Sequence, residues 1–295
     1  MTNQTHRLDL ADGRTLRVFE SGAVDGPIVV FLHGTPGCGR MRDTVIADAG
    51  ERGLRLLSYD RPGYGESSRL PGRVVAHAAE DVAAIVDHFG AERFAVMGAS
   101  GGGPHALACA ALLGDRIVGC ATLAGSAPMD GEGLDWTDGM GELNADEIEI
   151  ARQGFDVLHA HLREQADNEL LGTPEEMREG MASLLAPVDR EALTDELAEY
   201  LTAHFREAVE HGVDGWTDES LSDYQPWGFE LEEISAPVQL WHGEQDRFVP
   251  VGHGRWLAAH IPGVDARILP DQGHISLITG RTPDAHAWLA ERLAA

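Results

Sequence analysis

Short apolar runs without polar alternation constrain the fold of this chain more than any other feature. Each run is followed by Gly-rich turns and usually by a helical stretch. Strands that are apolar on both sides must be buried on both faces, which predicts an α/β fold: a mostly parallel sheet with helices on both faces. The runs occupy residues 28–32, 54–58, 94–97, 117–123, 238–241 and 266–269.

Elements at the two ends of the chain complete this pattern. Alternating leucines precede Asp12-Gly13, which supplies the positive-φ turn of an antiparallel hairpin, and the second strand returns at 16–19. Near the other end, helices are predicted over about 252–260 and 283–293. A length of 295 residues suits one large α/β domain with an insertion rather than two independent domains.

The insertion is predicted to be entirely helical. Thr173-Pro174-Glu175-Glu176 combines an N-cap, a proline at the first helical position and a Glu three residues after the cap. A second helix is predicted over 189–211, where apolar residues four apart share one face and Gly212 follows as the C-cap. The predicted domains are an α/β core, residues 1–129 and 236–295, and a helical cap, residues 130–235.

The charge of the chain excludes some partners. Asp and Glu number 49 against 22 basic residues, all of them Arg, and the net charge is −27. Nucleic-acid binding requires a basic surface and is excluded, and anionic membranes are disfavoured for the same reason. The predicted cap holds 29 acidic residues against five Arg, a net of −24. Solvated helical faces explain most such charge, but this cap should also repel anionic substrates within a Debye length of about 8 Å.

Cysteine usage and the N-terminal sequence indicate a cytoplasmic protein. Cys38, Cys109 and Cys120 are odd in number and lack C-x-x-C spacing, so we expect reduced thiols. Residues 1–18 lack the charged and apolar regions of a signal peptide, and no stretch approaches the ~20 apolar residues of a membrane span. We therefore expect no membrane contact. The oligomeric state is not predicted by any of these features.

The most specific motif is a G-x-S-x-G. Gly98-Ala99-Ser100-Gly101-Gly102 stands between the strand at 94–97 and a helix predicted over 101–113. A serine on a tight strand-to-helix turn needs flanking residues with almost no bulk, and Gly98 and Gly102 provide them. Ser100 is therefore the predicted nucleophile.

A serine nucleophile needs a histidine base and a carboxylate that orients it, in the chain order serine, acid, histidine for this topology. His274 follows the last predicted strand, and Asp246 follows the strand before it. Loops after neighbouring parallel strands meet at one edge of the sheet, so both side chains are expected near Ser100. Glu244 and Asp271 are nearby alternatives to Asp246. Asp271 is the weaker alternative because it lies only three positions before His274, which leaves little chain to turn its carboxylate back onto the imidazole.

The tetrahedral intermediate needs two N–H donors. Gly101 would supply one at the start of its helix, and Thr35, in the loop at 33–37, would supply the other. His33 in the same loop suits a structural hydrogen bond better than catalysis.

No metal or cofactor is predicted. His33, His242 and His274 could approach the same sheet edge, but neither H-E-x-x-H nor paired Cys/His spacing accompanies them. The glycines at 98–103 lack the register of a dinucleotide-binding loop.

Taken in order, the hairpin, the His33-Gly34 loop, the serine elbow, the cap and the Asp and His loops resemble the α/β-hydrolase superfamily over nearly the whole chain. The loop at 60–67, with the sequence DRPGYGES, and the cap position look like the branch that contains epoxide hydrolases, haloalkane dehalogenases and small-molecule esterases and lactonases. Those epoxide hydrolases and dehalogenases use an Asp nucleophile, so Ser100 argues against both activities. Proline iminopeptidases usually carry Trp at the elbow and an HGGPG loop, which leaves peptidase activity as a minor alternative.

The predicted function is a cofactor-free serine hydrolase that cleaves an uncharged, partly apolar small-molecule ester, lactone or thioester through an acyl-enzyme on Ser100. One alternative is a carbon–carbon bond hydrolase, lyase or cyclase with the same pocket, and another is a non-catalytic ligand receptor or signalling protein. The cap is expected to set the substrate. The large apolar residues predicted to line the pocket are Met129, Trp136, Trp216, Tyr224 and Trp227.

Overall fold

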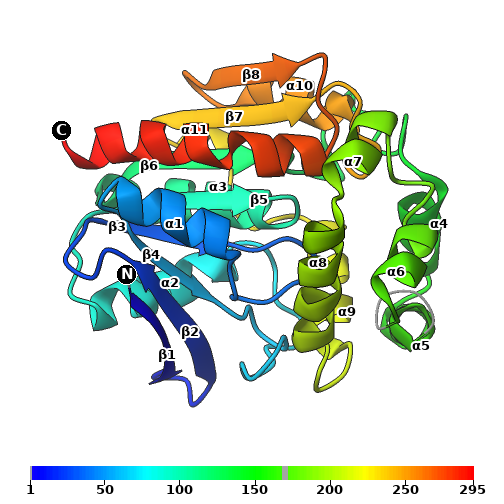
Figure 1. The fold of residues 1–295 in the computed structure, drawn as a ribbon, viewed down its shortest axis with the longest axis horizontal. Helices are drawn as coiled ribbons and strands as arrows, with labels where there is room; N and C mark the ends of the chain where they lie inside the picture. The colour runs from blue at the N-terminus through cyan, green and yellow to red at the C-terminus, as the bar shows by residue number, and fades with distance from the viewer. Residues whose placement is uncertain (1, 168–171) are drawn as a thin grey trace.

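The computed structural model describes residues 2–167 and 172–295, which form a single sheet with helices around it (Figure 1). The strands lie in the order β1-β2-β4-β3-β5-β6-β7-β8. Strand β2 runs antiparallel to both of its neighbours, and β4, β3, β5, β6, β7 and β8 are parallel. The strands are β1 Thr2–Asp9, β2 Thr15–Gly22, β3 Ile28–Leu32, β4 Arg55–Tyr59, β5 Phe94–Ala99, β6 Ile117–Leu123, β7 Val238–Gly243 and β8 Asp265–Leu269.

The apolar runs without polar alternation are strands of this sheet, as predicted. Every residue of β5, β6 and β7 is buried, because helices cover both faces of the central sheet. The predicted hairpin is also present: β1 pairs with β2 across a turn in which Gly13 has a φ of +88°. The fold class is therefore confirmed.

The core helices divide between the two faces of the sheet. Helices α1 and α11 bury Ile46 and Leu289 against one face, and helices α2, α3 and α10 bury Val82, Leu107 and Leu257 against the other. These helices are α1 Asp43–Glu51, α2 His77–His88, α3 Gly102–Leu112, α10 Val251–His260 and α11 Ile275–Leu293, with a short 3-10 turn η1 Gly114–Arg116.

Helices α4 to α9 lie between β6 and β7 in the chain and stand beyond the carboxyl ends of the strands (Figure 1). They bury an apolar cluster that includes Leu158, Met177 and Leu197 and continues into the core at Tyr64 and Ile275. Thr173 and Glu176 form the predicted capping box of α6. The cap elements are α4 Glu142–Ala151, α5 Phe155–Gln165, α6 Pro174–Gly180, α7 Pro187–Ala192, α8 Asp195–Ala208, α9 Asp214–Asp223 and the 3-10 turn η3 Leu231–Glu233.

The prediction of a single helix over 189–211 is wrong. Two helices, α7 and α8, occupy this stretch and are separated at Leu193 and Thr194. Thr194 has extended backbone, and its hydroxyl accepts a hydrogen bond from the Leu197 N–H at 3.3 Å. The apolar spacing indicated one helical face, but a threonine N-cap restarts the helix within it.

The last helix begins earlier than the predicted residue 283. Helix α11 starts at Ile275, directly after His274, and Pro283 lies inside it. Pro283 has no N–H to donate to the preceding turn. The Thr279 and Thr282 hydroxyls donate to carbonyls one turn earlier, both at 2.7 Å. Burial of one face of α11 against the sheet outweighs the hydrogen bond lost at Pro283. The proline therefore does not mark the start of the helix.

Candidate active site

Ser100 occupies a strained turn between β5 and α3. Its φ is +52°, a left-handed conformation that costs a residue other than glycine on the order of 1–3 kcal/mol. Two hydrogen bonds hold the turn: the Ser100 N–H donates to the Leu123 carbonyl, and the Gly103 N–H donates to the Ser100 carbonyl, each at 2.8 Å. Neighbouring strand β6 therefore helps to fix the serine.

The glycines that flank Ser100 are required by close backbone contacts. A Cβ on Gly98 would lie 2.1 Å from the Gly102 carbonyl oxygen, and a Cβ on Gly102 would lie 2.0 Å from the Leu32 carbonyl oxygen. Neither backbone oxygen can move away without distorting a strand or a helix. Small residues are thus needed at the two positions that the motif predicts.

Asp246 and His274 form a direct pair after β7 and β8. His274 Nδ1 and Asp246 Oδ2 are 2.7 Å apart, and both side chains are buried. The other Asp246 oxygen, Oδ1, accepts the N–H groups of Phe248 and Val249, each at 2.9 Å. Because a carboxylate only accepts hydrogen bonds, His274 donates from Nδ1 and keeps its Nε2 lone pair free.

The alternative carboxylates do not reach this histidine. Glu244 pairs with Arg255 at 2.6 Å on the surface, and Asp271 is exposed. His274 and Ser100 line the same cavity. Within the described residues the Ser100 hydroxyl makes no hydrogen bond, so it is free to turn toward His274 Nε2. The Phe248 ring stacks on the His274 ring with centroids 4.6 Å apart, which holds the imidazole plane in place.

The loop after β3 lies against the elbow. A Cβ on Gly34 would lie 3.4 Å from the Ser100 Cβ, and a Cβ on Gly101 would lie 3.4 Å from the Thr35 nitrogen. The two predicted oxyanion residues, Thr35 and Gly101, are therefore neighbours beside Ser100. His33 is buried, with its Nδ1 2.7 Å from the Gly34 carbonyl oxygen, and accepts the Arg61 N–H at 3.3 Å. Burial and the nearby Arg61 hold the pKa of His33 well below its usual value, which suits a neutral structural hydrogen-bonding role.

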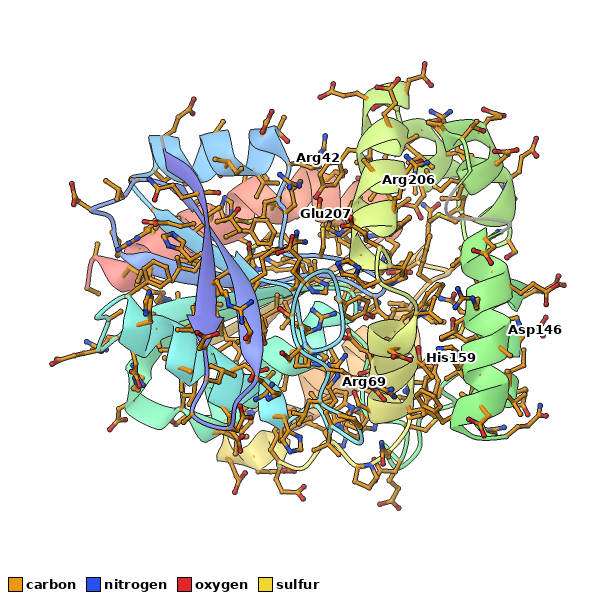
Figure 2. All side chains as sticks on the ribbon, turned by 90° about the horizontal axis from the view of Figure 1, so that it is seen from below. Arg42, Arg69, Asp146, His159, Arg206 and Glu207 are labelled. Atoms are coloured by element: carbon orange, nitrogen blue, oxygen red, sulfur yellow. The ribbon has the colours of Figure 1, made fainter. Side chains whose placement is uncertain are left out.

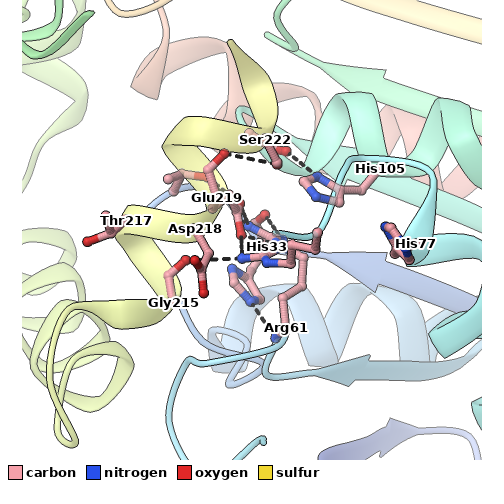
Figure 3. Close-up of polar contacts among 12 residues, drawn as sticks. His33, Arg61, His77, His105, Gly215, Thr217, Asp218, Glu219 and Ser222 are labelled. Atoms are coloured by element: carbon pink, nitrogen blue, oxygen red, sulfur yellow. Dashed lines mark hydrogen bonds and ion pairs between the residues drawn. The ribbon is translucent and has the colours of Figure 1, made fainter. Parts of the chain in front are cut away.

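Sequence reasoning missed Glu219, a fully buried carboxylate on cap helix α9 that holds the Thr35 loop. Glu219 pairs with Arg61 (Figure 3). It also accepts the Thr35 hydroxyl at 2.5 Å and Arg73 NH2 at 2.8 Å. Arg61 also donates to the carbonyls of His33 and Gly34. Burial opposes ionisation of Glu219, but the two guanidinium groups outweigh it and hold the pKa of the carboxyl well below its usual range.

Sequence reasoning also missed Asp189, a buried carboxylate on cap helix α7 that holds the His274 loop. Its Oδ2 accepts the His274 N–H at 3.0 Å, and its Oδ1 accepts the Ser276 N–H and hydroxyl at 2.9 and 3.0 Å. A Cβ on Gly273 would lie 2.3 Å from this carboxylate. The negative charge sits at the start of α11, where it opposes the unsatisfied N–H groups.

Other ion pairs join the cap to the core near its edge. Glu207 on α8 pairs with Arg40 at 2.6 Å and with Arg17 at 2.9 Å. Arg69 pairs with Asp218 on α9 at 2.6 Å. Figure 2 labels Glu207 and Arg69 where these two helices face the core.

Two cavities adjoin Ser100. The larger, about 270 Å³, contains His274 and is lined mainly by apolar side chains, among them Met41, Val45 and Leu201. The smaller, about 140 Å³, contains Gly101 and extends under the cap. Thr35 and Phe248 line both cavities.

Three of the five predicted cap residues, Trp136, Trp216 and Tyr224, line the smaller cavity. Met129 and Trp227 line neither cavity, so the prediction for these two is wrong. Trp227 is buried in the core, where its ring stacks on Phe229 with centroids 5.7 Å apart. The Trp227 carbonyl accepts the Ala76 N–H at 2.9 Å, which ties this segment to the core. Met129 lies in a turn in which the Gly131 N–H donates to the Pro128 carbonyl.

Other types of site are absent from the part of the chain that the structure describes. Over 2–167 and 172–295, no group of three or more His, Cys, Asp or Glu side chains is arranged to hold a metal ion. Cys38, Cys109 and Cys120 are all free and buried. Within the same ranges, every helix is too short or too polar to cross a membrane.

Comparisons with known proteins identify the family and the fold. Residues 27–281 match the family described as alpha/beta hydrolase fold. A 2-hydroxy-6-oxononadienedioate/2-hydroxy-6-oxononatrienedioate hydrolase of Klebsiella pneumoniae is 28% identical over 275 residues, covering 89% of this chain and 86% of that protein. A bifunctional esterase/perhydrolase of Acinetobacter calcoaceticus is 25% identical over 245 residues, covering 81% of each. An esterase from Exiguobacterium antarcticum has a TM-score of 0.73 at 17% identity, covering 99% of this chain and 100% of that one; this likeness concerns the fold alone.

Proposed function

The chain belongs to the α/β-hydrolase family, and we propose that it is a cofactor-free serine hydrolase acting on a small-molecule ester, lactone or thioester through an acyl-enzyme on Ser100. One observation carries this proposal. A serine held at a φ of +52° lines the same cavity as a histidine that is hydrogen-bonded at 2.7 Å to a buried aspartate. This combination supplies a nucleophile, a base and an orienting carboxylate.

The proposed reaction uses only side chains and backbone groups of this chain. Ser100 Oγ attacks the substrate carbonyl carbon and passes its proton to His274 Nε2, while Asp246 stabilises the imidazolium. The oxyanion accepts N–H groups of Thr35 and Gly101, the latter at the positive end of α3. Collapse of the intermediate expels the alcohol or thiol, which takes the proton from His274. Water then attacks the acyl carbon and gives a proton to His274 Nε2, and collapse of the second intermediate releases the acid and returns that proton to Ser100 Oγ.

Replacement of the nucleophile tests this proposal. Ser100→Ala should lower kcat for an aryl ester by about 10⁴-fold or more, because the remaining groups have no covalent intermediate to stabilise. The exposed Ser235→Ala is a matched control that should keep wild-type turnover. Unchanged turnover in Ser100→Ala would contradict the proposal. Stoichiometric labelling of Ser100 by an organophosphonate, with multiple turnovers of ester, would also separate an enzyme from a ligand receptor.

A carbon–carbon bond hydrolase is a second candidate, favoured by the relative from Klebsiella pneumoniae. That relative is named for a dioate, a substrate with two carboxylates. The acidic cap of this chain, with Glu147 and Asp223 lining the smaller cavity, disfavours such a substrate. A kcat/KM for that dioate above the value for neutral aryl esters would favour the second candidate.

A further inference from the structure

The two cavities beside Ser100 differ in chemistry. The larger is mainly apolar, and the carboxylate that lines it, Asp48, is already paired with Arg52 and His286. The smaller contains two carboxyl groups, Glu147 and Asp223, and the amide of Gln165. No Arg or His is among the described residues that line the smaller cavity. Arg61 and Arg73 lie nearby but are bound to Glu219 and do not line it. The smaller cavity therefore holds acidic groups without a cation of its own.

The proposed reaction assigns a different half of the substrate to each cavity. His274 must hand a proton to the leaving alcohol, so the alcohol occupies the larger cavity, which His274 lines. The smaller cavity contains the oxyanion residue Gly101 and lacks His274, so it receives the acyl chain. The acyl chain thus points toward Asp223 and Glu147.

Two acceptors in the smaller cavity have no partner within the described residues. Asp223 is 9% exposed and Gln165 is 6% exposed, and neither Asp223 Oδ1 nor Gln165 Oε1 receives a hydrogen bond. A buried acceptor without a donor is unfavourable, and both of these oxygens are covered by the protein; a donor on a bound molecule makes the two missing contacts once the side chains turn toward the cavity. This observation distinguishes the cavity from a cluster of acids that satisfy one another.

The remaining walls of the smaller cavity suit a cation. Glu147 Oε1 accepts the hydroxyls of Ser220 at 2.8 Å and Tyr224 at 3.5 Å, which fix the carboxyl in the cavity. The rings of Trp136 and Tyr224 meet edge to face with centroids 5.7 Å apart and offer aromatic surface.

Burial raises the pKa of Glu147 to about 7, and burial together with Glu219 raises the pKa of Asp223 well above its usual range. A positive charge beside these carboxyls would favour their ionised forms.

We propose that the smaller cavity binds a protonated amine carried by the acyl part of the substrate, with Asp223, Gln165 and Glu147 as acceptors. The proposal rests on the hydrolase function proposed above and makes it more specific. It also changes the sequence-based expectation of an uncharged substrate, because the charge is predicted to be positive and confined to the acyl end.

Paired substrates test this assignment in the wild-type enzyme. The aryl esters of β-alanine and γ-aminobutyrate carry an ammonium group where butanoate and pentanoate esters carry a methyl group. We expect kcat/KM to be about tenfold or more higher for an amino-acyl ester than for its alkyl partner, as for a buried charged hydrogen bond. An amine placed in the alcohol part should bring no such gain, because that part lies in the apolar cavity.

Substitutions identify the carboxyl group that causes the preference for amino-acyl esters. Asp223→Asn should reduce the ratio of amino-acyl to alkyl kcat/KM toward one, whereas Glu199→Gln, an exposed cap carboxylate, should leave the ratio unchanged. Because the ratio is taken within each variant, a general loss of folded enzyme does not alter it. Equal use of amino-acyl and alkyl esters by the wild type, both through Ser100, would overturn the amine site and leave the hydrolase function standing. Failure of all esters and of Ser100 labelling would instead overturn the hydrolase function.

Discussion

The core and the cap contribute different kinds of acidic residue to the site. The core supplies the reacting groups, and its carboxylate Asp246 touches the histidine itself. The cap supplies Asp189 and Glu219, which are buried against core loops and touch no reacting atom. The cap is therefore more than a cover over the cavity. Part of its charge of −24 is buried and holds the loops of His274 and Thr35 in place.

The largest effect should come from the core carboxylate. Asp246→Asn should lower kcat by about 10³–10⁴-fold, because an amide cannot stabilise the imidazolium and its NH₂ favours the wrong tautomer of His274. KM should change much less. The measurement is steady-state kinetics with an aryl ester, and Glu244→Gln, the neighbouring surface acid, is the control. A loss of less than tenfold would mean that the reaction does not depend on this pair.

The next largest effect should come from the cap carboxylate with two arginine partners. Glu219→Gln leaves Arg61 and Arg73 buried without a counter-charge, so the free energy of unfolding should fall by about 3–5 kcal/mol. Denaturant unfolding measures this, with the exposed Glu210→Gln as the control. A loss below about 1 kcal/mol would show that the cap does not anchor the Thr35 loop as described.

The smaller cavity should make stability depend on pH. Burial raises the pKa of Glu147 from about 4.5 to about 7, so the folded protein binds a proton there that the unfolded chain has released. This contribution is full below pH 4.5 and is lost as the pH rises through 7, by up to about 3 kcal/mol. The difference in unfolding free energy between wild type and Glu147→Gln should therefore shift over that window. A constant difference would contradict the raised pKa.

The smallest effect should come from the carboxylate that holds the His274 loop. Asp189→Asn keeps one acceptor oxygen but loses the other, so stability should fall by roughly 1–2 kcal/mol. Because His274 shifts relative to Ser100, kcat should fall about tenfold with little change in KM. The exposed Asp195→Asn on the neighbouring helix should leave both values unchanged. A rise in KM as large as the fall in kcat would instead indicate a general disturbance of the cap.

The fold was predictable because its signals are local. Strands β3 and β6 begin and end at the predicted residues, since burial on both faces leaves an unbroken apolar run. Ser100, Asp246 and His274 follow strand ends, and parallel topology brings such ends to one edge. The two wrong helix boundaries also have local causes. The last helix was predicted to start at Pro283, but a proline can also lie inside a helix. The helix over 189–211 was predicted from a continuous apolar face, which Thr194 interrupts.

The cap carboxylates could not be predicted in the same way. Asp189 contacts His274, 85 positions away, and Glu219 contacts Thr35, 184 positions away. In the sequence both are ordinary acids among many in an acidic helical segment, and no spacing distinguishes them from solvated residues. Only the packing of α7 and α9 against the core reveals their partners.

Rapid-quench mass spectrometry of the intact protein can detect the acyl-enzyme that Ser100 is proposed to form. Wild-type enzyme mixed with an aryl ester should gain the mass of one acyl group, mapped to the peptide that contains Ser100, before steady state is reached. Ser100→Ala should show neither the added mass nor the turnover. Full turnover without an acyl group on Ser100, or an acyl group on another residue, would contradict the account.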